Sequence, residues 1–263
     1  MKIAIAFYGI PRSTIKSYPS IEEKIINTLP DGAETKIFYH LYDQAAISNK
    51  RSGENSPIEK SAYSPFLVHN GFLEVPGECL EKWPLEQIKE YGDTWDDNFQ
   101  SLSNLMHQLN SLFEVTKLVE DFDPDIVIFL RPDLIYHDTP PHDAYSFILK
   151  AGRAIFIPDW QWWGGYNDRF SICNKESYKT YGKRITQALQ FCETQKKSLN
   201  SEELVKFVID KANISVYPLS IKASRARVDG TVKKEIFSTY RGMGGAKGSI
   251  SLITKKIKLI LAK

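Results

Sequence analysis

Short apolar runs recur along the chain and predict the strands of a sheet. In the first of them, residues 2–8, apolar side chains occupy both alternating faces, which is typical of a strand covered on both sides. Four further runs have the same character: "KIFYHLY" (36–42), "DIVIFL" (125–130), "AIFIP" (154–158) and "ISVYPL" (214–219). A shorter strand is expected at "RFSIC" (169–173).

Amphipathic helices are expected between several of these strands. The clearest helical pattern runs from about Phe99 to Phe122, where one stripe is apolar. The stripe comprises Leu102, Leu105, Met106, Leu109, Leu112, Phe113, Thr116 and Leu118. Strands that alternate with helices are typical of α/β proteins with a parallel or mostly parallel sheet. We therefore expect residues 1–237 to form an α/β domain in which helices flank such a sheet.

Two segments depart from this alternation. Residues 44–75 are polar and rich in turn residues, which predicts a mobile excursion over the sheet edge. Residues 238–249 contain four glycines and are expected to form a flexible linker. After it, residues 250–263 combine an apolar stripe with four lysines, which predicts a basic amphipathic helix. The stripe consists of Ile250, Ile253, Ile257, Ile260 and Leu261.

Composition narrows the class of protein. The 263 residues are 42% hydrophobic, enough for a large core, and no apolar run approaches the roughly 18 residues of a membrane span. We expect no signal peptide. The three cysteines (Cys79, Cys173 and Cys192) are unclustered, which favours a reducing, cytoplasmic location without disulfides.

The net charge of +2 conceals a basic C-terminal end. From Lys222 onward, eleven Lys or Arg residues stand against Asp229 and Glu235. This asymmetry predicts an anionic partner for that end, such as the inner face of an anionic membrane. No nucleic-acid-binding motif accompanies the basic residues, so no nucleic-acid partner is expected.

The loop after the first strand, "GIPRS" (9–13), suits a phosphate group. Gly9 allows close approach of a ligand to the backbone, and the guanidinium of Arg12 offers several donors. A helix that begins near Ser13 would add free backbone N–H groups that favour an anion. The alternative is an ordinary strand-to-helix turn with a surface arginine.

A second candidate lies at the end of the 125–130 strand, in "LRPDL". Pro132 ends the strand, and Asp133 then emerges at the carboxyl edge, where open α/β sheets bind ligands. Its carboxylate suits Mg²⁺ or Mn²⁺, or the hydroxyl groups of a sugar. The alternative is an ion pair with Arg131 that closes a turn.

The segment "WQWWGGYND" (160–168) suits carbohydrate. Three tryptophans, of which Trp163 is the last, offer flat surfaces for sugar rings. Asn167 and Asp168 follow, and Asp168 is a candidate sugar ligand or general base. Alternatively, the tryptophans fill the core and Asp168 caps a turn.

Two further stretches carry charge at suitable places. In "LNSEELVKFVI", Ser201 is a candidate N-cap, and helix capping by itself accounts for Glu202 and Glu203. In "KASRARVDG", Arg225 and Arg227 face the same way if the segment is extended, so together they can clamp a diphosphate.

The order of these pieces over residues 1–230 resembles the small nucleotide-sugar glycosyltransferases of surface-polysaccharide loci and large DNA viruses, which have a Rossmann-like GT-A fold. The pieces are "YGIPRS", "HQLNSLFEV", "FDPDIVIFLRPDL", "GGYNDRF", "EELVKF" and "RARVDG". The resemblance implies transfer of a sugar from a nucleotide-diphosphate sugar to a glycan or lipid-linked acceptor.

The resemblance also implies roles for residues. Tyr8, Gly9 and Arg12 would contact the base and diphosphate, and Asp133 would take the place of the metal-binding acid. Asp168 and Glu202 would line the sugar and acceptor side as catalytic candidates. The Asp-x-Asp motif of the GT-A fold is absent at the strand end, which leaves a requirement for Mn²⁺ or Mg²⁺ open.

Two other functions fit parts of the sequence. "GIPRS" resembles the phosphosulfate-binding loop of sulfotransferases, although the glycine and second hydroxyl expected after Ser13 are missing from their places. A non-enzymatic, nucleotide-binding scaffold of a polysaccharide assembly is the third alternative.

Overall fold

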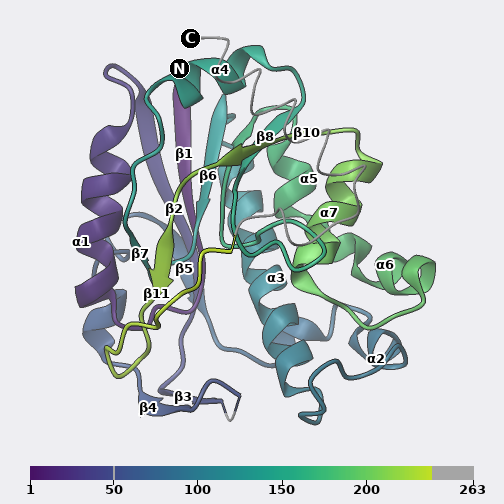
Figure 1. The fold of residues 1–263 in the computed structure, drawn as a ribbon. Helices are drawn as coiled ribbons and strands as arrows, with labels where there is room; N and C mark the ends of the chain where they lie inside the picture. Colours follow the sequence, from purple (N-terminus) through teal and green to yellow (C-terminus); the bar gives the residue numbers. More distant parts are fainter. Residues whose placement is uncertain (50, 239–263) are drawn as a thin grey trace.

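The computed structural model describes residues 1–49 and 51–238, and its centre is a seven-stranded sheet (Figure 1). In sheet order the strands are β10 (Ser215–Leu219), β8 (Ala154–Pro158), β9 (Phe170–Asn174), β6 (Ile126–Leu130), β1 (Lys2–Gly9), β2 (Glu34–Tyr42) and β5 (Asn70–Glu74). Only β9 runs antiparallel to its neighbours, β6 and β8, and the other pairs are parallel. The predicted mostly parallel sheet is confirmed.

Helices cover both faces of this sheet (Figure 1). One face packs against α1 (Thr14–Lys24) and α4 (Asp143–Lys150). The other packs against α3 (Gln100–Glu120) together with shorter helices. These are α2 (Leu85–Lys89), α5 (Tyr178–Gly182), α6 (Ala188–Gln195) and α7 (Ser201–Lys211). The short 3₁₀ turns are η1 (Ile26–Thr28), η2 (Lys60–Tyr63), η3 (Glu78–Leu80) and η4 (Arg184–Gln187).

The central strand β1 shows why the apolar runs were informative. Its alternate residues enter two different cores: Ile3, Ile5 and Phe7 lie on the α1 side, and Ala4, Ala6 and Tyr8 on the α3 side. Such burial on both faces requires an almost uninterrupted apolar run. All five apolar runs and "RFSIC" form strands of this sheet.

Two small ribbons lie outside the main sheet. The first pairs β7 (Leu134–Tyr136) with β11 (Ala223–Arg225), and the second is the hairpin of β3 (Ala46–Asn49) and β4 (Glu54–Pro57). Because Gly9 and Leu130 end neighbouring strands, the loops that carry Arg12 and Asp133 meet at the carboxyl edge. The β7–β11 pairing brings Arg225 to the same place.

Residues 44–75, expected to be a mobile excursion over the sheet edge, instead form regular structure, because they contribute both a hairpin and the edge strand β5. Ile47, Ile58 and Tyr63 form part of a small separate core. Glu54 is buried there and pairs with two arginines from distant segments. The composition of the segment did not reveal this order because its partners are remote in sequence.

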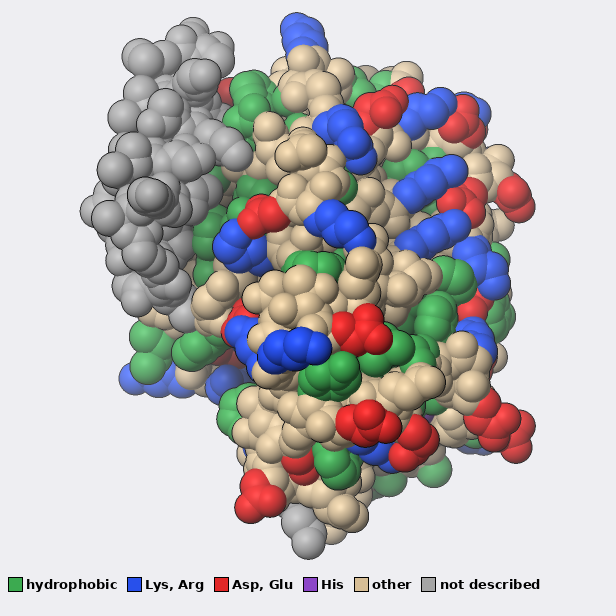
Figure 2. Space-filling model, turned by 90° about the vertical axis from the view of Figure 1, so that its right-hand side faces the viewer, with side chains coloured by type: hydrophobic (Ala, Val, Ile, Leu, Met, Phe, Trp, Pro, Cys, Tyr) green, Lys and Arg blue, Asp and Glu red, His purple; other side chains and the backbone are tan. Residues whose placement is uncertain are grey.

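The face that carries α5, α6 and α7 is shown in Figure 2, where lysines and acidic residues are interspersed. Several of these charges pair, as Lys206 does with Asp210 and as Lys179 and Lys183 do with Glu120. Exposed pairs of this kind contribute little to stability. Within the described residues, no helix has the length and apolar character needed to cross a membrane. The predicted linker from residue 239 and the 250–263 helix lie outside the described residues.

The contact between α5 and α3 provides a test of the packing. A Cβ atom at Gly182 would lie 2.1 Å from Oγ1 of Thr116, so Gly182→Ala cannot be accommodated without a shift of the helices. We expect Gly182→Ala to lower the free energy of unfolding by about 1–3 kcal/mol in denaturant titrations. Lys179→Ala, on the exposed part of α5, is the control and should change it much less. Equal stability of both variants would contradict this packing.

Candidate active site

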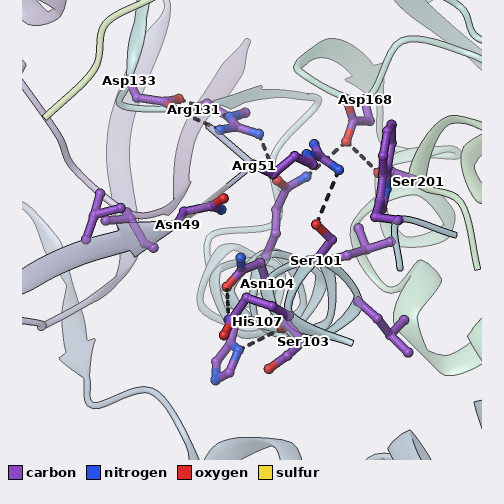
Figure 3. Close-up of a pocket in the computed structure, with 18 of the residues that line it drawn as sticks. Asn49, Arg51, Ser101, Ser103, Asn104, His107, Arg131, Asp133, Asp168 and Ser201 are labelled. Atoms are coloured by element: carbon purple, nitrogen blue, oxygen red, sulfur yellow. Dashed lines mark hydrogen bonds and ion pairs between the residues drawn. The ribbon is translucent and has the colours of Figure 1, made fainter. Parts of the chain in front are cut away.

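A cleft of about 790 Å³ opens at the carboxyl ends of the central strands (Figure 3). Most of the residues singled out in the sequence line it: Tyr8, Gly9, Arg12, Arg131, Asp133, Trp163, Asp168, Glu202 and Arg225. In Figure 3, Arg131 and Asp133 lie at one end and Asp168 with Ser201 at another, while Ser101 and Asn104 project from α3 between them. One cleft therefore unites residues from five separate stretches of sequence.

The end of β1 forms one wall of the cleft. Gly9 has a φ of +102°, a conformation that favours glycine, and its N–H donates to Oγ of Ser111 (2.7 Å). The hydroxyl of Tyr8 is fully buried and donates to the backbone carbonyl of Asp168 (2.8 Å). Burial raises the pKa of Tyr8 well above its ordinary value. Tyr8 therefore acts as a neutral tether between β1 and the Asp168 loop.

Asp133 is the centre of a cluster of arginines. Its Oδ1 accepts from Nε of Arg131 (3.0 Å), and its Oδ2 accepts from Nη2 of Arg131 and Nη1 of Arg12 (both 2.8 Å). The Nε of Arg225 lies 3.9 Å from Oδ2. Burial opposes a charge on Asp133, but the attraction of Arg131 and then Arg12 outweighs it and holds the pKa of this carboxyl well below its ordinary value.

The surroundings of Asp133 do not fit the divalent metal that the resemblance implied. Mg²⁺ and Mn²⁺ need free oxygen ligands, whereas both oxygens of Asp133 are engaged by guanidinium groups. Within residues 1–49 and 51–238, no three His, Cys, Asp or Glu side chains are grouped as a metal site requires. The sequence alternative of an Arg131–Asp133 ion pair at the turn is the arrangement observed.

A second buried carboxylate, Glu54 on β4, extends the cluster. It accepts from Nη1 of Arg227 (2.6 Å) and from the N–H of Val228 (3.1 Å), and Nε of Arg12 lies 3.6 Å away. Arg12 thus bridges the two carboxylates. Arg227 is held at Glu54 and does not line the cleft, so Arg225 is the member of the predicted pair that faces it.

Asp168 lies across the cleft from the arginine cluster. Its Oδ2 accepts hydrogen bonds from Nε2 of Gln108 (3.0 Å) and from the hydroxyl of Ser201. Burial opposes its charge, but the attraction of Arg131 and the Ser201 hydrogen bond lower the pKa of Asp168 below its ordinary value. Asp168 is therefore a fixed negative charge at neutral pH.

Glu202 lies in the first turn of α7, and its pKa is shifted in the opposite direction from that of Asp168. Burial and the negative charge of Asp168 raise the pKa of Glu202 to about 8. The two acids come together because Gly165 packs on the backbone of α7, where a Cβ would lie 1.9 Å from the carbonyl oxygen of Glu202. One acid stays ionised while the other exchanges a proton near neutral pH, which is the arrangement of an acid–base pair.

The tryptophans divide between core and cleft. Trp160 and Trp162 are buried, and their indole N–H groups donate to the carbonyls of Ile221 and Pro158 (both 2.6 Å). Trp163 is 51% exposed and lines the cleft. The core-filling alternative therefore holds for Trp160 and Trp162, and stacking of a sugar ring stays a prediction for Trp163.

Two other predicted residues do not line the cleft. The amide of Asn167 donates to the carbonyl of Trp160 and accepts from the N–H of Arg169, which shapes the loop. Ser13 precedes α1 as its N-cap residue, without a side-chain capping bond. The expected N-cap of α7 also differs, because Asn200 accepts from the N–H of Glu203 while Ser201 is committed to Asp168.

The sequence analysis missed several residues of the site. Gln108 joins its two halves, since it donates to Asp168 and accepts from Nη1 of Arg131 (2.7 Å). Arg169 lies over the ring of Trp160 and 3.8 Å from Glu235. Polar positions on the otherwise apolar α3 were the available signal for Gln108, but no local signal distinguishes Glu54.

Comparisons with known proteins give only distant likenesses. No family model matches the chain, and no curated protein matches it significantly. The apo form of mouse xyloside xylosyltransferase 1 is 9% identical, with 83% of this chain and 85% of that one covered at a TM-score of 0.42. The galactosyltransferase LgtC, in complex with donor and acceptor sugar analogues, is 13% identical, with 82% and 73% covered at a TM-score of 0.40. Likeness at this level assigns no role to any residue of this chain.

Proposed function

We propose that this chain is a GT-A-type glycosyltransferase that takes a sugar from a nucleotide-diphosphate sugar. The observation that carries the proposal is the cleft itself, where a buried arginine cluster faces a pair of acids with opposite proton affinities. The arginine cluster can stabilise an anionic leaving group. The pair of acids can serve the transfer of a sugar to a hydroxyl group. The site lies at the carboxyl edge of the sheet, as α/β proteins favour.

The arginines act on the leaving group. When the bond between sugar and diphosphate breaks, negative charge develops on the phosphate oxygen. Arg12, Arg131 and Arg225 are held in place by Asp133, so they stabilise that charge without reorganising. The half-exposed ring of Trp163 offers a stacking surface for a sugar at the same cleft.

The acids act on the sugar and the acceptor. Asp168 remains ionised and stabilises positive charge at the sugar carbon that loses the diphosphate. Glu202 is the better general base, because its raised pKa gives its carboxylate a higher proton affinity than that of Asp168. In this assignment the acceptor hydroxyl gives its proton to Glu202 as its oxygen attacks the sugar carbon. This differs from the sequence analysis, which put Asp168 first as a base candidate.

The sulfotransferase alternative is less well supported. A phosphosulfate loop would present hydroxyls at the start of α1, but the hydroxyl of Thr14 is buried and donates to the carbonyl of Ala62 (2.9 Å). Ser13 does not line the cleft. A scaffold protein would have no use for two acids in one cleft whose pKa values are shifted in opposite directions. Incubation with UDP-, GDP-, CDP- and dTDP-sugars, with release of nucleoside diphosphate as the readout, tests the proposed function directly.

The acceptor and setting of the reaction are part of the proposal. We expect a glycan or lipid-linked acceptor in surface-polysaccharide assembly, and a cytoplasmic location at the inner face of the membrane. Support comes from the sequence alone, through the apolar and lysine pattern of residues 250–263.

Asp168→Asn should lower turnover roughly 100- to 1000-fold, because the variant keeps the hydrogen-bonding shape but removes the negative charge that faces the sugar. Nucleoside diphosphate affinity should survive, because the arginine cluster remains. Turnover and isothermal titration of the same preparation provide the measurement. Loss of nucleotide binding together with turnover would contradict the placement of Asp168 on the sugar side of the cleft.

The pH dependence of kcat/KM should follow the protonation state of Glu202. A base must be deprotonated, so kcat/KM should rise with pH and approach a plateau above about 8, and Glu202→Gln should be slow at every pH. Stability should show the opposite trend. Because the folded pKa lies above the ordinary value of 4.5, the contribution of Glu202 is full below that pH and is lost as pH rises through about 8.

Melting temperatures test the raised pKa of Glu202 independently of turnover, and the rate profile tests its role as a base. Glu202→Gln should match the wild type near pH 4.5 and exceed it increasingly toward pH 8.5. A constant difference between the two proteins across this range, or a rate profile without a rise, contradicts the assignment.

The basic C-terminal segment should bind anionic vesicles. Each lysine near an anionic surface contributes about 1 kcal/mol, so the full chain should co-sediment with anionic vesicles at low salt and much less at high salt. A chain without residues 246–263, and neutral vesicles with the full chain, are the controls. Equal sedimentation with and without the segment would remove its role as an anchor.

A further inference from the structure

The arginines of the cleft have hydrogen-bonding capacity that the described part of the chain does not use. Nε of Arg12, Nε of Arg225 and Nη1 of Arg169 are buried, yet they find no hydrogen-bond partner among the residues that the structure describes. Their ion-pair distances to carboxylate oxygens, 3.6–3.9 Å, are too long for hydrogen bonds. Buried donors without acceptors are costly, so these three indicate an acceptor that residues 1–49 and 51–238 do not provide.

The charge of the cleft also indicates an anionic ligand. Of the described residues that line it, six are cationic and four carry carboxyl groups. One of those four, Glu202, is largely protonated at neutral pH. Burial, and then the charge of Arg131, lower the pKa of Arg225, because together with the other arginines they outweigh the attraction of Asp133. The cleft is thus electrostatically prepared for an anion.

A cation at Asp133 would have to break these contacts. Asp133 is 1% exposed, and each of its oxygens accepts at least one hydrogen bond from Arg131 or Arg12. A divalent ion there would displace a guanidinium group and then lie beside several positive charges. The carboxylate is therefore suited to fixing guanidinium groups in place, which leaves their remaining N–H groups for the ligand.

We propose that the diphosphate of the donor binds directly to the guanidinium groups of Arg12, Arg131, Arg169 and Arg225, without a divalent cation, and that Asp133 is a positioning residue. This inference rests on the proposed function and adds the form in which the donor is recognised: a metal-free diphosphate, with one negative charge on each phosphate. Phosphate oxygens provide the acceptors that the buried N–H groups lack.

Isothermal titration with inorganic pyrophosphate and with uridine, guanosine and cytidine diphosphates tests the proposal. We expect pyrophosphate and at least one nucleotide to bind in EDTA, and added Mg²⁺ or Mn²⁺ to leave affinity unchanged or weaken it by competing for the diphosphate. Binding that requires Mg²⁺ or Mn²⁺ would overturn this inference and leave the glycosyltransferase proposal standing. Failure of every nucleotide to bind in either buffer would overturn both.

Two variants identify the residues involved. Arg225→Gln should weaken binding in EDTA roughly tenfold to a hundredfold, the loss expected for a charged hydrogen bond. Arg153→Gln, an exposed arginine just before the amino end of β8, is the matched control and should bind as the wild type does. Unchanged binding by Arg225→Gln would overturn the proposal.

Asp133→Asn separates a positioning residue from a metal ligand. If Asp133 only positions the arginines, the variant should melt at a lower temperature and bind pyrophosphate more weakly in EDTA, because the guanidinium groups of Arg131 and Arg12 are held less firmly, and added Mn²⁺ should not change the size of this loss. A metal ligand predicts wild-type binding that depends on Mn²⁺ and is lost in Asp133→Asn. If this variant fails to fold, Arg225→Gln and the comparison of binding with and without EDTA still test whether the diphosphate binds without a metal ion.

Discussion

The site depends on the buried negative charge of Asp133. A lone carboxylate at this depth would be strongly destabilising, and what keeps it ionised is the set of guanidinium groups from three distant segments. Arg12 follows β1, Arg131 follows β6 and Arg225 ends β11. The same electrostatic requirement therefore joins the central strands to the β7–β11 ribbon and places the cationic groups in the cleft. Removing one partner would leave the others uncompensated, so the cluster is expected to act as a unit.

Glu54 extends this principle to the hairpin of β3 and β4. That segment has little apolar area, yet it is anchored because Glu54 binds Arg227 and lies near Arg12. The hairpin contributes Ile47 and Asn49 to the lining of the cleft. Electrostatic pairing thus holds this polar segment in place, as apolar burial holds β1. The pairing also places the hairpin beside the loop that carries Arg12.

The two acids show how position sets chemistry. Asp168 and Glu202 are both carboxylic acids in one cleft, yet the pKa of one is lowered and that of the other is raised. Asp168 lies near Arg131 and accepts hydrogen bonds from Gln108 and Ser201, whereas Glu202 faces the negative charge of Asp168. A fixed anion and a proton-exchanging acid result from identical functional groups.

The strands, the main helix and several charged residues of the cleft could be predicted from the sequence. Burial on both faces of β1 imposes a local apolar run, and strand ends at the carboxyl edge are marked locally by Gly9 and Pro132, so these features are visible without contacts. Arg12, Arg131 and Asp133 were identified in this way, whereas Asp168 and Arg225 were identified from the composition of their own segments.

The partners of those residues depend on contacts that form only when the chain folds. Asn200 and Ser201 are equally suitable N-caps by residue type. Asn200 is the N-cap observed, because the hydroxyl of Ser201 donates to Asp168, which is remote in sequence. Arg12 and Arg225 join the Arg131–Asp133 ion pair that the sequence allowed, and Glu202 acquires its high proton affinity, for the same reason. Charge interactions depend on distances between segments that the chain brings together only when it folds, and no local pattern encodes those distances.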